Sequence, residues 1–421
     1  MSSICIFEDD RYTGLLPLVW FRPAFDLRCG MNTLYEKIKR SYPRTNVYLL
    51  CRDYLSNNAK RDHAGSMVGR IGKETSVLFI NGRLLCDKEI VKKIPLTGAD
   101  EIFECEGAIV AARLSKGNLE LVSNSISAPV TAAALSSVKS TARTTNIKVK
   151  MINSFFDIIT DNREEIANDF AYFTRGGITR GKIHQTVALY GRGNIFVDDG
   201  ADIEAFVTLD AREGPIFISK GVKVQPYTRI QGPCFIGENT VITSHANIRG
   251  GTSIGPKCKV GGELEETVFH GYSNKQHYGF IGHSYIGEWV NLGAGVTNSD
   301  LKNNYGNVKI KYMENETDSN RMFLGCAIAD HTKVGIGVLL ITGSVIGAAC
   351  NIFGGGLMNK FVPSFAWGSA HKMEKYEPER AIKTAQVVMN RRDVEMDQSD
   401  IDVFRKVFEL TDEERTSSGI K

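Results

Sequence analysis

The sequence predicts an α/β domain followed by a left-handed parallel β-helix and a short helical tail. The main observation is a six-residue repeat of apolar residues, which neither a 3.6-residue helix nor a two-residue strand produces. The repeat starts with eight positions at unbroken spacing: Ile218, Val224, Ile230, Ile236, Ile242, Ile248, Ile254 and Val260. It returns at Ile286, Leu292, Ile328, Val334, Leu340, Ile346 and Ile352. The second observation is the alternation of apolar runs and helical patterns before residue 157, which favours a mostly parallel sheet.

A hexapeptide β-helix explains the repeat, because each hexapeptide forms one short strand and one turn, and three hexapeptides form a triangular coil. The branched residue points into the prism. A second register, four positions later, holds small residues suited to the corners and includes Cys234 and Cys258. Glycines such as Gly237, Gly255 and Gly287 permit the turn geometry.

The N-terminal elements follow from short apolar runs separated by helical patterns. Predicted strands are Ile4–Phe7, Val47–Cys51, Val77–Ile80 and Ala108–Ala112. Predicted helices are Thr33–Arg40, Lys88–Lys93 and Val130–Val138, with one more near Arg163–Phe173 in the bridge to the β-helix. In the tail we expect helices over Pro378–Arg392 and Ser399–Phe408, with Ser399 or Asp400 as the cap of the second. The predicted parts are residues 1–157 (α/β domain), 158–182 (linker), 183–370 (β-helix) and 371–421 (tail, expected to cap the solenoid).

Composition excludes several classes of protein. The net charge of +3 is well mixed along the chain, so no nucleic acid partner is expected. Nine cysteines without a CxxC pair indicate reduced thiols, and the N-terminus lacks the pattern of a signal peptide. The uncharged stretch Val334–Asn359 is long enough to span a bilayer, but its six-residue repeat assigns it to the β-helix. We therefore expect a cytoplasmic protein without a membrane span.

Several motifs carry a resemblance to a known family. Residues Gly271–Gly295, which contain His277 and end in Val290-Asn-Leu-Gly-Ala-Gly295, resemble the acetyltransferase half of bacterial bifunctional N-acetylglucosamine-1-phosphate uridylyltransferases. The whole chain is more similar to their divergent sugar nucleotidyltransferase relatives. The motifs shared with those relatives are Leu16–Gly30, Phe79–Leu85, Ser299–Gly306 and Phe353–Gly356, so the resemblance covers about residues 1–370.

The resemblance implies acyl transfer from acetyl-CoA to an amino sugar phosphate. His277 matches the catalytic base, and histidine suits this role because its unperturbed pKa lies near the working pH. Matching positions for the sugar phosphate are Arg249, Asn291, Asn304 and Tyr305, and those for the acyl-CoA are Ala294 and Cys326. From spacing alone, His277, Arg249 and Asn291 also have structural interpretations, as a loop histidine, a turn arginine and a corner asparagine. His283 is at most a supporting partner.

Three positions depart from the family pattern. A lysine expected near the sugar phosphate falls on Thr267, with Lys275 as a candidate replacement, and an expected tyrosine is Phe280. The serine expected near the acyl donor falls on Cys326. The acyl acceptor can therefore differ from glucosamine 1-phosphate. Related β-helix acyltransferases bind the donor between subunits, so we expect a homotrimer.

The N-terminal domain allows three interpretations. Nucleotidyl transfer needs basic groups around a triphosphate and a carboxylate-held Mg²⁺. In the family a metal-binding aspartate follows the third strand, whereas here Asn81-Gly82 is followed by Arg83, which cannot hold Mg²⁺. An active but rearranged site would use Asp9, Asp10 or Asp87 for metal and Arg22, Arg28 and Arg83 for phosphates. The alternatives are a domain that binds nucleotide without turnover, and a structural remnant.

The sequence thus predicts a sugar-phosphate enzyme whose β-helix transfers an acyl group. One alternative is a sugar-1-phosphate nucleotidyltransferase that uses the β-helix as a trimerisation stalk and a nucleoside triphosphate as second substrate. The other is a non-catalytic binding or scaffold protein. The sugar, the acyl group and the nucleotide do not follow from the sequence.

Overall fold

The computed structural model describes residues 2–125, 129–130, 134–135, 137–174 and 176–420. The chain forms two compact units. Unit 1 comprises Met1–Leu27 and Asn32–Ser154, and unit 2 comprises Arg28–Met31 and Phe155–Lys421. The end of unit 1 lies three residues before the predicted boundary at 157. The sequence did not predict that Arg28–Met31 belongs to unit 2.

Unit 1 contains a seven-stranded mixed sheet with the strand order β5-β4-β1-β6-β8-β7-β9. The strands are β1 (Ser3–Phe7), β4 (Asn46–Leu50), β5 (Met67–Val68), β6 (Ser76–Asn81), β7 (Glu101–Cys105), β8 (Ala108–Ser115) and β9 (Arg143–Asn146). The pairings of β1 with β4 and β6 are parallel, whereas β8 runs antiparallel to β6 and β7. The sheet is therefore mostly parallel, as predicted, because β4·β5 and β7·β9 are parallel as well. The antiparallel exceptions involve β8, which forms a hairpin with β7 whose two turn residues Glu106 and Gly107 both have positive φ.

The helices of unit 1 are short. They are α1 (Leu34–Ser41), α2 (Ser56–Asp62), α3 (Ile90–Lys93) and α4 (Lys116–Ser125), with 3₁₀ turns η1 (Asp10–Leu15), η2 (Ala24–Asp26) and η3 (Asp53–Leu55) and the short strand β3 (Asn32–Thr33). A capping box of Thr33 and Glu36 begins α1. Every residue of β1 is buried, as expected for a central strand covered on both faces. Most of the predicted helix Val130–Val138 falls on or beside residues 131–133 and 136, which lie outside the described residues.

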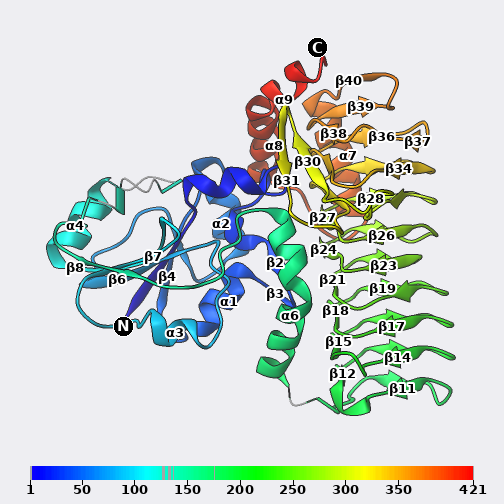
Figure 1. Ribbon diagram of the computed structural model, residues 1–421, viewed down its shortest axis with the longest axis horizontal. Coiled ribbons are helices and arrows are strands. Elements are labelled where there is room, and N and C mark those ends of the chain that lie inside the picture. The colour runs from blue at the N-terminus through cyan, green and yellow to red at the C-terminus, as the bar shows by residue number, and fades with distance from the viewer. Residues whose placement is uncertain (1, 126–128, 131–133, 136, 175, 421) are drawn as a thin grey trace. The chain divides into compact units, whose positions relative to one another are not determined.

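Unit 2 is built around the predicted β-helix (Figure 1), whose strands stack coil upon coil in three parallel sheets. Face 1 contains β10 (Lys182–Ile183), β13 (Asp202–Ile203), β16 (Lys223–Val224), β19 (Val241–Ile242), β22 (Lys259–Val260), β25 (Asn274–Lys275), β28 (Asn291–Leu292), β33 (Lys333–Val334), β36 (Asn351–Ile352) and β39 (Ala366–Gly368), with β40 (Met373–Lys375) added antiparallel. Face 2 contains β11 (Ala188–Tyr190), β14 (Thr208–Asp210), β17 (Arg229–Gln231), β20 (Asn247–Ile248), β23 (Glu263–Glu265) and β26 (Phe280–Gly282), continued by β29 (Thr297–Asn298), β34 (Val338–Leu340) and β37 (Gly356–Leu357). Face 3 contains β12 (Ile195–Val197), β15 (Ile216–Ile218), β18 (Cys234–Ile236), β21 (Thr252–Ile254), β24 (Val268–Gly271), β27 (Tyr285–Glu288), β32 (Cys326–Ile328), β35 (Ser344–Ile346) and β38 (Phe361–Val362).

The chain passes from face 1 to face 2, then to face 3, and back to face 1. We call the three lines of turns edge 1–2, edge 2–3 and edge 3–1. The six-residue repeat lines the prism as predicted: Ile218 pairs with Ile236 and Ile236 with Ile254 on face 3, and all three are fully buried. An insertion between β29 and β32 leaves the coil at edge 2–3 and carries the hairpin β30 (Lys309–Tyr312) and β31 (Asn315–Asp318).

Helix α6 (Phe155–Phe173) belongs to unit 2 and is longer than the predicted helix near Arg163–Phe173. The Asn162 amide donates to Gly251 O at 2.8 Å and accepts from Gly30 N at 2.7 Å. Gly30, in the segment that includes β2 (Arg28–Cys29), has φ +76°, and an added Cβ would lie 2.6 Å from the Asp169 carboxylate. Only glycine therefore fits this close approach to α6.

The tail forms α7 (Pro378–Asn390), α8 (Gln398–Leu410) and α9 (Asp412–Ser417). The cap of α8 is Asp397, in a capping box with Asp400, rather than the predicted Ser399 or Asp400. Ile420 packs in the core of the β-helix, as expected for a tail that closes the solenoid.

No helix among the described residues is both long and apolar enough to cross a membrane.

Candidate functional site

The predicted phosphate-binding Arg83 and the predicted metal ligand Asp9 are bonded to each other at the carboxyl ends of β1 and β6. Arg83 Nε donates to Asp9 Oδ1 at 2.7 Å, and Nη2 donates to Asp9 Oδ2 at 2.6 Å. The amide of Asn81 donates to Asp9 Oδ2 at 2.9 Å, and Arg83 Nη1 donates to Ile152 O and to the Asn153 side chain. Because Arg83 is fully buried and its donors are engaged, its role in this structure is to hold unit 1 together.

A second buried pair at the same end of the sheet was missed by sequence reasoning. Arg52 Nε donates to Glu8 Oε2 at 2.9 Å and Nη2 donates to Glu8 Oε1 at 3.0 Å, while Glu8 also accepts from Ala24 N. Arg52 further donates to the carbonyl oxygens of Val19 and Arg22. Part of the apolar motif around Arg22 therefore surrounds this ion pair. Sequence reasoning missed the pair because a buried charge next to an apolar run leaves no periodic pattern in the sequence.

The other predicted residues of unit 1 are dispersed. Asp10 is exposed, and Asp87 Oδ1 accepts from the backbone N–H groups of Glu89 and Ile90, as a turn cap does. Arg22 is buried in unit 1, whereas Arg28 belongs to unit 2, where its Nε donates to His270 O at 3.2 Å. The predicted triad of arginines therefore does not form within one unit.

Asp9, the buried candidate among the predicted metal ligands, does not fit a bound Mg²⁺ in this structure. Both oxygens of Asp9 already accept hydrogen bonds from Arg83 and Asn81, so metal binding would have to replace a buried ion pair. Among the described residues no cluster of three aspartate, glutamate, histidine or cysteine side chains has a metal-binding arrangement. We derive no step of nucleotidyl transfer through a metal ion.

The predicted base His277 lies on edge 1–2, in the exposed loop between β25 and β26. The ammonium of Lys275 is buried beneath this loop and donates to His277 O and, at 2.8 Å, to Tyr278 O. Burial lowers the pKa of Lys275 to about 8. The imidazole of His277 contacts no hydrogen-bond partner in the described part of the chain, so it faces solvent on a backbone that is held from below.

The predicted acyl-CoA residue Ala294 lies on the same edge, one coil further on. Gly295 N donates to Tyr278 O at 2.9 Å, so the Ala294-Gly295 turn lies against the loop of His277. Cys326 does not join it: this side chain is part of the buried core of the prism, and burial raises its pKa to about 12. A contact between Cys326 and a donor outside the prism does not fit this position.

Arg249 lies at the other side of face 2, on edge 2–3. Its Nη1 is 2.5 Å from Glu265 Oε2 and 3.8 Å from Glu263 Oε1. Burial raises the pKa of Glu265, while Arg249 opposes this shift. A sugar phosphate at Arg249 would have to compete with these carboxylates. Asn304 and Tyr305 are exposed in the insertion that leaves the coil at the same edge.

Asn291 lies on face 1 next to edge 3–1. The predicted site residues His277, Arg249 and Asn291 therefore lie at three different edges of the prism. Asn291 Oδ1 accepts from the Asn274 amide at 3.5 Å, and Asn274 in turn accepts from Arg392 after α7. These contacts agree with the structural interpretation of Asn291 as a corner asparagine that bonds along the stack of coils. One chain alone therefore does not assemble the predicted acyl-transfer site.

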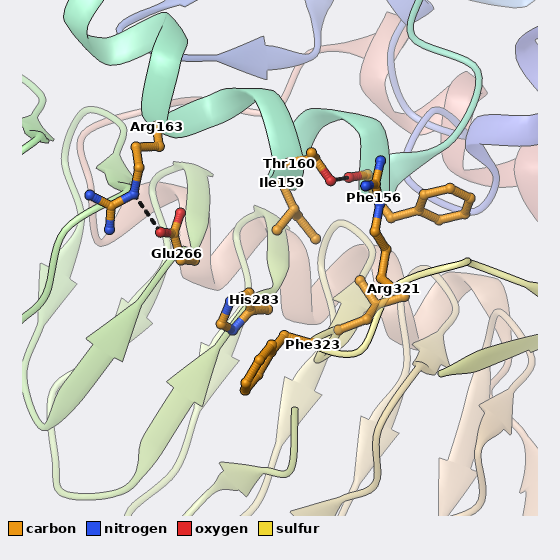
Figure 2. A pocket seen from close by; sticks show the side chains of 9 residues that line it. Phe156, Ile159, Thr160, Arg163, Glu266, His283, Arg321 and Phe323 are labelled. Atoms are coloured by element: carbon orange, nitrogen blue, oxygen red, sulfur yellow. Dashed lines mark hydrogen bonds and ion pairs between the residues drawn. The ribbon is translucent and has the colours of Figure 1, made fainter. Parts of the chain in front are cut away.

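The structure brings together a different set of polar residues at edge 2–3 (Figure 2). His283 Nδ1 is 2.8 Å from Asp300 Oδ2, and the ring stacks on Phe323 with centroids 5.3 Å apart. A cavity of about 220 Å³ opens beside them, lined also by Arg163 and Glu266, which form an ion pair at 2.7 Å. Sequence reasoning treated His283 as at most a supporting partner because it matched no family motif. The insertion that brings Phe323 to it has no repeat from which the contact could be predicted.

Residues 4–178 match the family model described as sugar nucleotidyl transferase. This confirms the predicted resemblance for the N-terminal part of the chain. A bifunctional sugar-1-phosphate nucleotidylyltransferase/acetyltransferase from Sulfurisphaera tokodaii is 34% identical over 113 residues, which is 26% of this chain and 28% of that protein. The match therefore spans little more than a quarter of the length of this relative.

Solved structures of two acyltransferases are similar to the chain at low sequence identity. UDP-N-acetylglucosamine acyltransferase from Arabidopsis is 13% identical, with 50% of this chain and 79% of that chain covered and a TM-score of 0.24. UDP-N-acetylglucosamine O-acyltransferase from Moraxella catarrhalis is also 13% identical, with 55% and 97% covered and a TM-score of 0.24. With TM-scores this low, these superpositions assign no function to this chain.

Proposed function

We propose that this chain is a sugar-phosphate transferase whose β-helix transfers an acyl group from acyl-CoA to an amino sugar phosphate. The observation that carries the proposal is His277, an exposed imidazole on a loop that the buried Lys275 holds from below. A general base needs this combination of access to solvent and fixed position. The acetyltransferase part of the Sulfurisphaera tokodaii protein's name supports the same reaction class.

In the proposed reaction the amine of the acceptor attacks the thioester carbonyl of acyl-CoA. The C–N bond forms and the C–S bond breaks. His277 removes the proton of the amine and passes it to the departing thiolate, so the products are an amide and free coenzyme A. The acyl-CoA arm runs past Ala294, which has only a methyl side chain, and Gly295, which has none, next to the ring of Tyr278.

We further propose that the protein acts as a cytoplasmic homotrimer. Edge 1–2 carries a broken row of exposed apolar side chains, in which Tyr278 and Ile336 are each 73% exposed. Phe206 and Tyr227, in two successive turns of the same edge, stack with centroids 5.2 Å apart. An apolar row of this kind is typical of a surface that another subunit covers. In a trimer a neighbouring subunit supplies the groups that edge 1–2 lacks, such as Arg249 and Asn291.

The test is thiol release from acetyl-CoA with glucosamine 1-phosphate. The His277→Ala variant should lose on the order of 10²- to 10⁴-fold in rate. His184→Ala is the matched control, because His184 is also an exposed turn histidine, in the first coil. Sedimentation establishes whether each variant remains a trimer. Equal rates for wild type and His277→Ala would remove His277 as base, and no release from wild type would remove this donor and acceptor pair.

A second candidate is sugar-1-phosphate nucleotidyl transfer by unit 1, which the family match over residues 4–178 favours. The cavity at the carboxyl end of β1, next to Asp10 and Arg11, measures only about 20 Å³, so a nucleotide requires this region to open. The test is pyrophosphate release with Mg²⁺, a sugar 1-phosphate and each nucleoside triphosphate in turn. Absence of both thiol and pyrophosphate release would favour the binding or scaffold protein.

A further inference from the structure

The cavity at edge 2–3 lies wholly within unit 2, between α6 and the β-helix. Figure 2 shows His283 near the middle of its wall, with Arg163 on one side and Arg321 on the other. The volume of about 220 Å³ is below the range of drug-sized ligand pockets. A ligand of monosaccharide size fits this volume, whereas a complete nucleotide sugar or coenzyme A does not.

The geometry of His283 leaves one ring nitrogen available to a ligand. An ionised carboxylate only accepts hydrogen bonds, so Asp300 fixes the proton of the neutral imidazole on Nδ1. Nε2 then carries a lone pair, and no other described group contacts it. A ring nitrogen held in this way accepts a hydrogen bond from a hydroxyl or an amine.

The chain around His283 is arranged to keep this orientation. An added Cβ at Gly282 would lie 2.5 Å from Asp300 Oδ2, so glycine is needed for the carboxylate to reach the imidazole. The backbone N–H of His283 donates to Glu265 O at 2.9 Å, and Gly325 N donates to His283 O at 2.9 Å. These bonds fix the histidine from both neighbouring coils.

The charges that line the cavity favour an anion with hydroxyl groups. Arg321 is exposed and pairs with no acidic side chain among the described residues. Arg163 pairs with Glu266 through Nε, and its Nη groups lie against Gly250 and point away from His283 in Figure 2. Arg321 is therefore the cation of the cavity that remains for an anion. Guanidinium groups bind phosphate through paired N–H donors. Ile159 and Phe323 supply apolar surface of the kind that sugar rings contact.

We propose that this cavity is a binding site for a phosphorylated monosaccharide, separate from the edge that carries His277. The phosphate contacts Arg321. A hydroxyl or amino group of the sugar donates to His283 Nε2, and Asp300 positions the imidazole. Arg321 selects the anion, and His283 selects a ligand that also carries a hydrogen-bond donor.

Calorimetric titration of the full-length protein tests the site without acyl-CoA, so the result does not depend on acyl transfer. The probes are glucosamine 1-phosphate, glucose 1-phosphate and inorganic phosphate. We expect Arg321→Gln to weaken binding of all three probes about 10-fold or more. His283→Gln should weaken the two sugar phosphates by a similar factor and leave inorganic phosphate unchanged. The matched controls are Arg192→Gln and His184→Gln, at exposed turns of the first coils.

Three results would overturn the proposal. One is the absence of sugar phosphate binding to the wild-type protein. Another is an equal affinity of wild type, Arg321→Gln and His283→Gln for the sugar phosphates. The last is binding that His277→Gln abolishes while His283→Gln leaves it intact, since this places the ligand on edge 1–2. Near-ultraviolet circular dichroism and thermal midpoints of each variant establish that a lost affinity does not reflect unfolding.

Discussion

Arg83 and Asp9 form two parallel hydrogen bonds of 2.7 and 2.6 Å at the carboxyl ends of β1 and β6, where both residues are buried. In open α/β sheets this region, where neighbouring strands diverge, is where ligands bind. Here a guanidinium occupies it. Arg83 stands where a metal-binding aspartate was expected. The ion pair that it forms with Asp9 occupies the position that a ligand would otherwise take.

We expect Arg83→Met to lower the free energy of unfolding of unit 1 by about 3 to 5 kcal/mol, because it leaves the buried carboxylate of Asp9 without its partner. The double variant Asp9→Asn with Arg83→Met should recover part of this loss. Urea unfolding followed by circular dichroism measures both. Arg11→Met is the control, because Arg11 is exposed nearby. A loss no larger than that of Arg11→Met would show that the pair is dispensable.

The sequence predicts the β-helix well because its six-residue repeat records which side chains point into the prism. It does not predict which edge a residue occupies, because the coils differ in length. Val241 pairs with Lys259, 18 residues on, but Lys259 pairs with Asn274 after 15 and Asn274 with Asn291 after 17. The next step, from Asn291 to Lys333, takes 42 residues because of the insertion. His277 and Arg249 therefore lie on opposite sides of face 2, although each matches its own motif.

The same limit applies to unit 1. Strand β1 was predicted correctly because every one of its residues is buried and apolar runs report this directly. Arg28 was predicted to bind nucleotide phosphates, whereas its backbone N–H donates to the Tyr285 hydroxyl at 3.0 Å inside unit 2. A contact between residues 257 positions apart leaves no local pattern in the sequence.

Lys275 should control the mobility of the loop that carries His277. Lys275→Met keeps a similar length but removes the donors to His277 O and Tyr278 O. Hydrogen bonds from charged groups contribute about 1.5 to 3 kcal/mol, so we expect amide exchange to accelerate on the order of 10-fold or more at Gly295, whose N–H donates to Tyr278 O. Exchange measured by mass spectrometry checks this. Lys259→Met, on the same face, is the control, and equal exchange in the two variants would contradict the assignment.

The C-terminal tail should stabilise the end of the β-helix through Ile420 and Glu414. Ile420 is buried in the core of the prism, while Glu414 accepts from Ser364 N at 2.8 Å and from the Tyr312 hydroxyl at 2.7 Å. We expect Ile420→Ala to lower the free energy of unfolding of unit 2 by about 2 kcal/mol. Val387→Ala removes an exposed side chain from α7 and should change it by less than about 0.5 kcal/mol. Similar thermal midpoints for both variants would mean that the tail does not close the solenoid.

Lys333 should make the stability of unit 2 depend on pH in the alkaline range. Its ammonium is buried and donates to Trp289 O and His331 O, and burial lowers its pKa to about 7, partly offset by Asp330. In the unfolded chain a lysine has a pKa of about 10.4. Between these two values the unfolded state binds more protons than the folded state, so the free energy of unfolding rises with pH.

This group alone should add at most about 1.4 kcal/mol per pH unit between pH 7 and 10, and nothing below pH 7, where both states are protonated. Lys333→Met removes the titrating group, so its free energy of unfolding should rise less steeply with pH than that of wild type. Urea unfolding of both proteins at pH 7, 8 and 9 measures the two slopes. Parallel slopes would show that Lys333 keeps an ordinary pKa in the folded protein, with its charge stabilised by the two carbonyl oxygens.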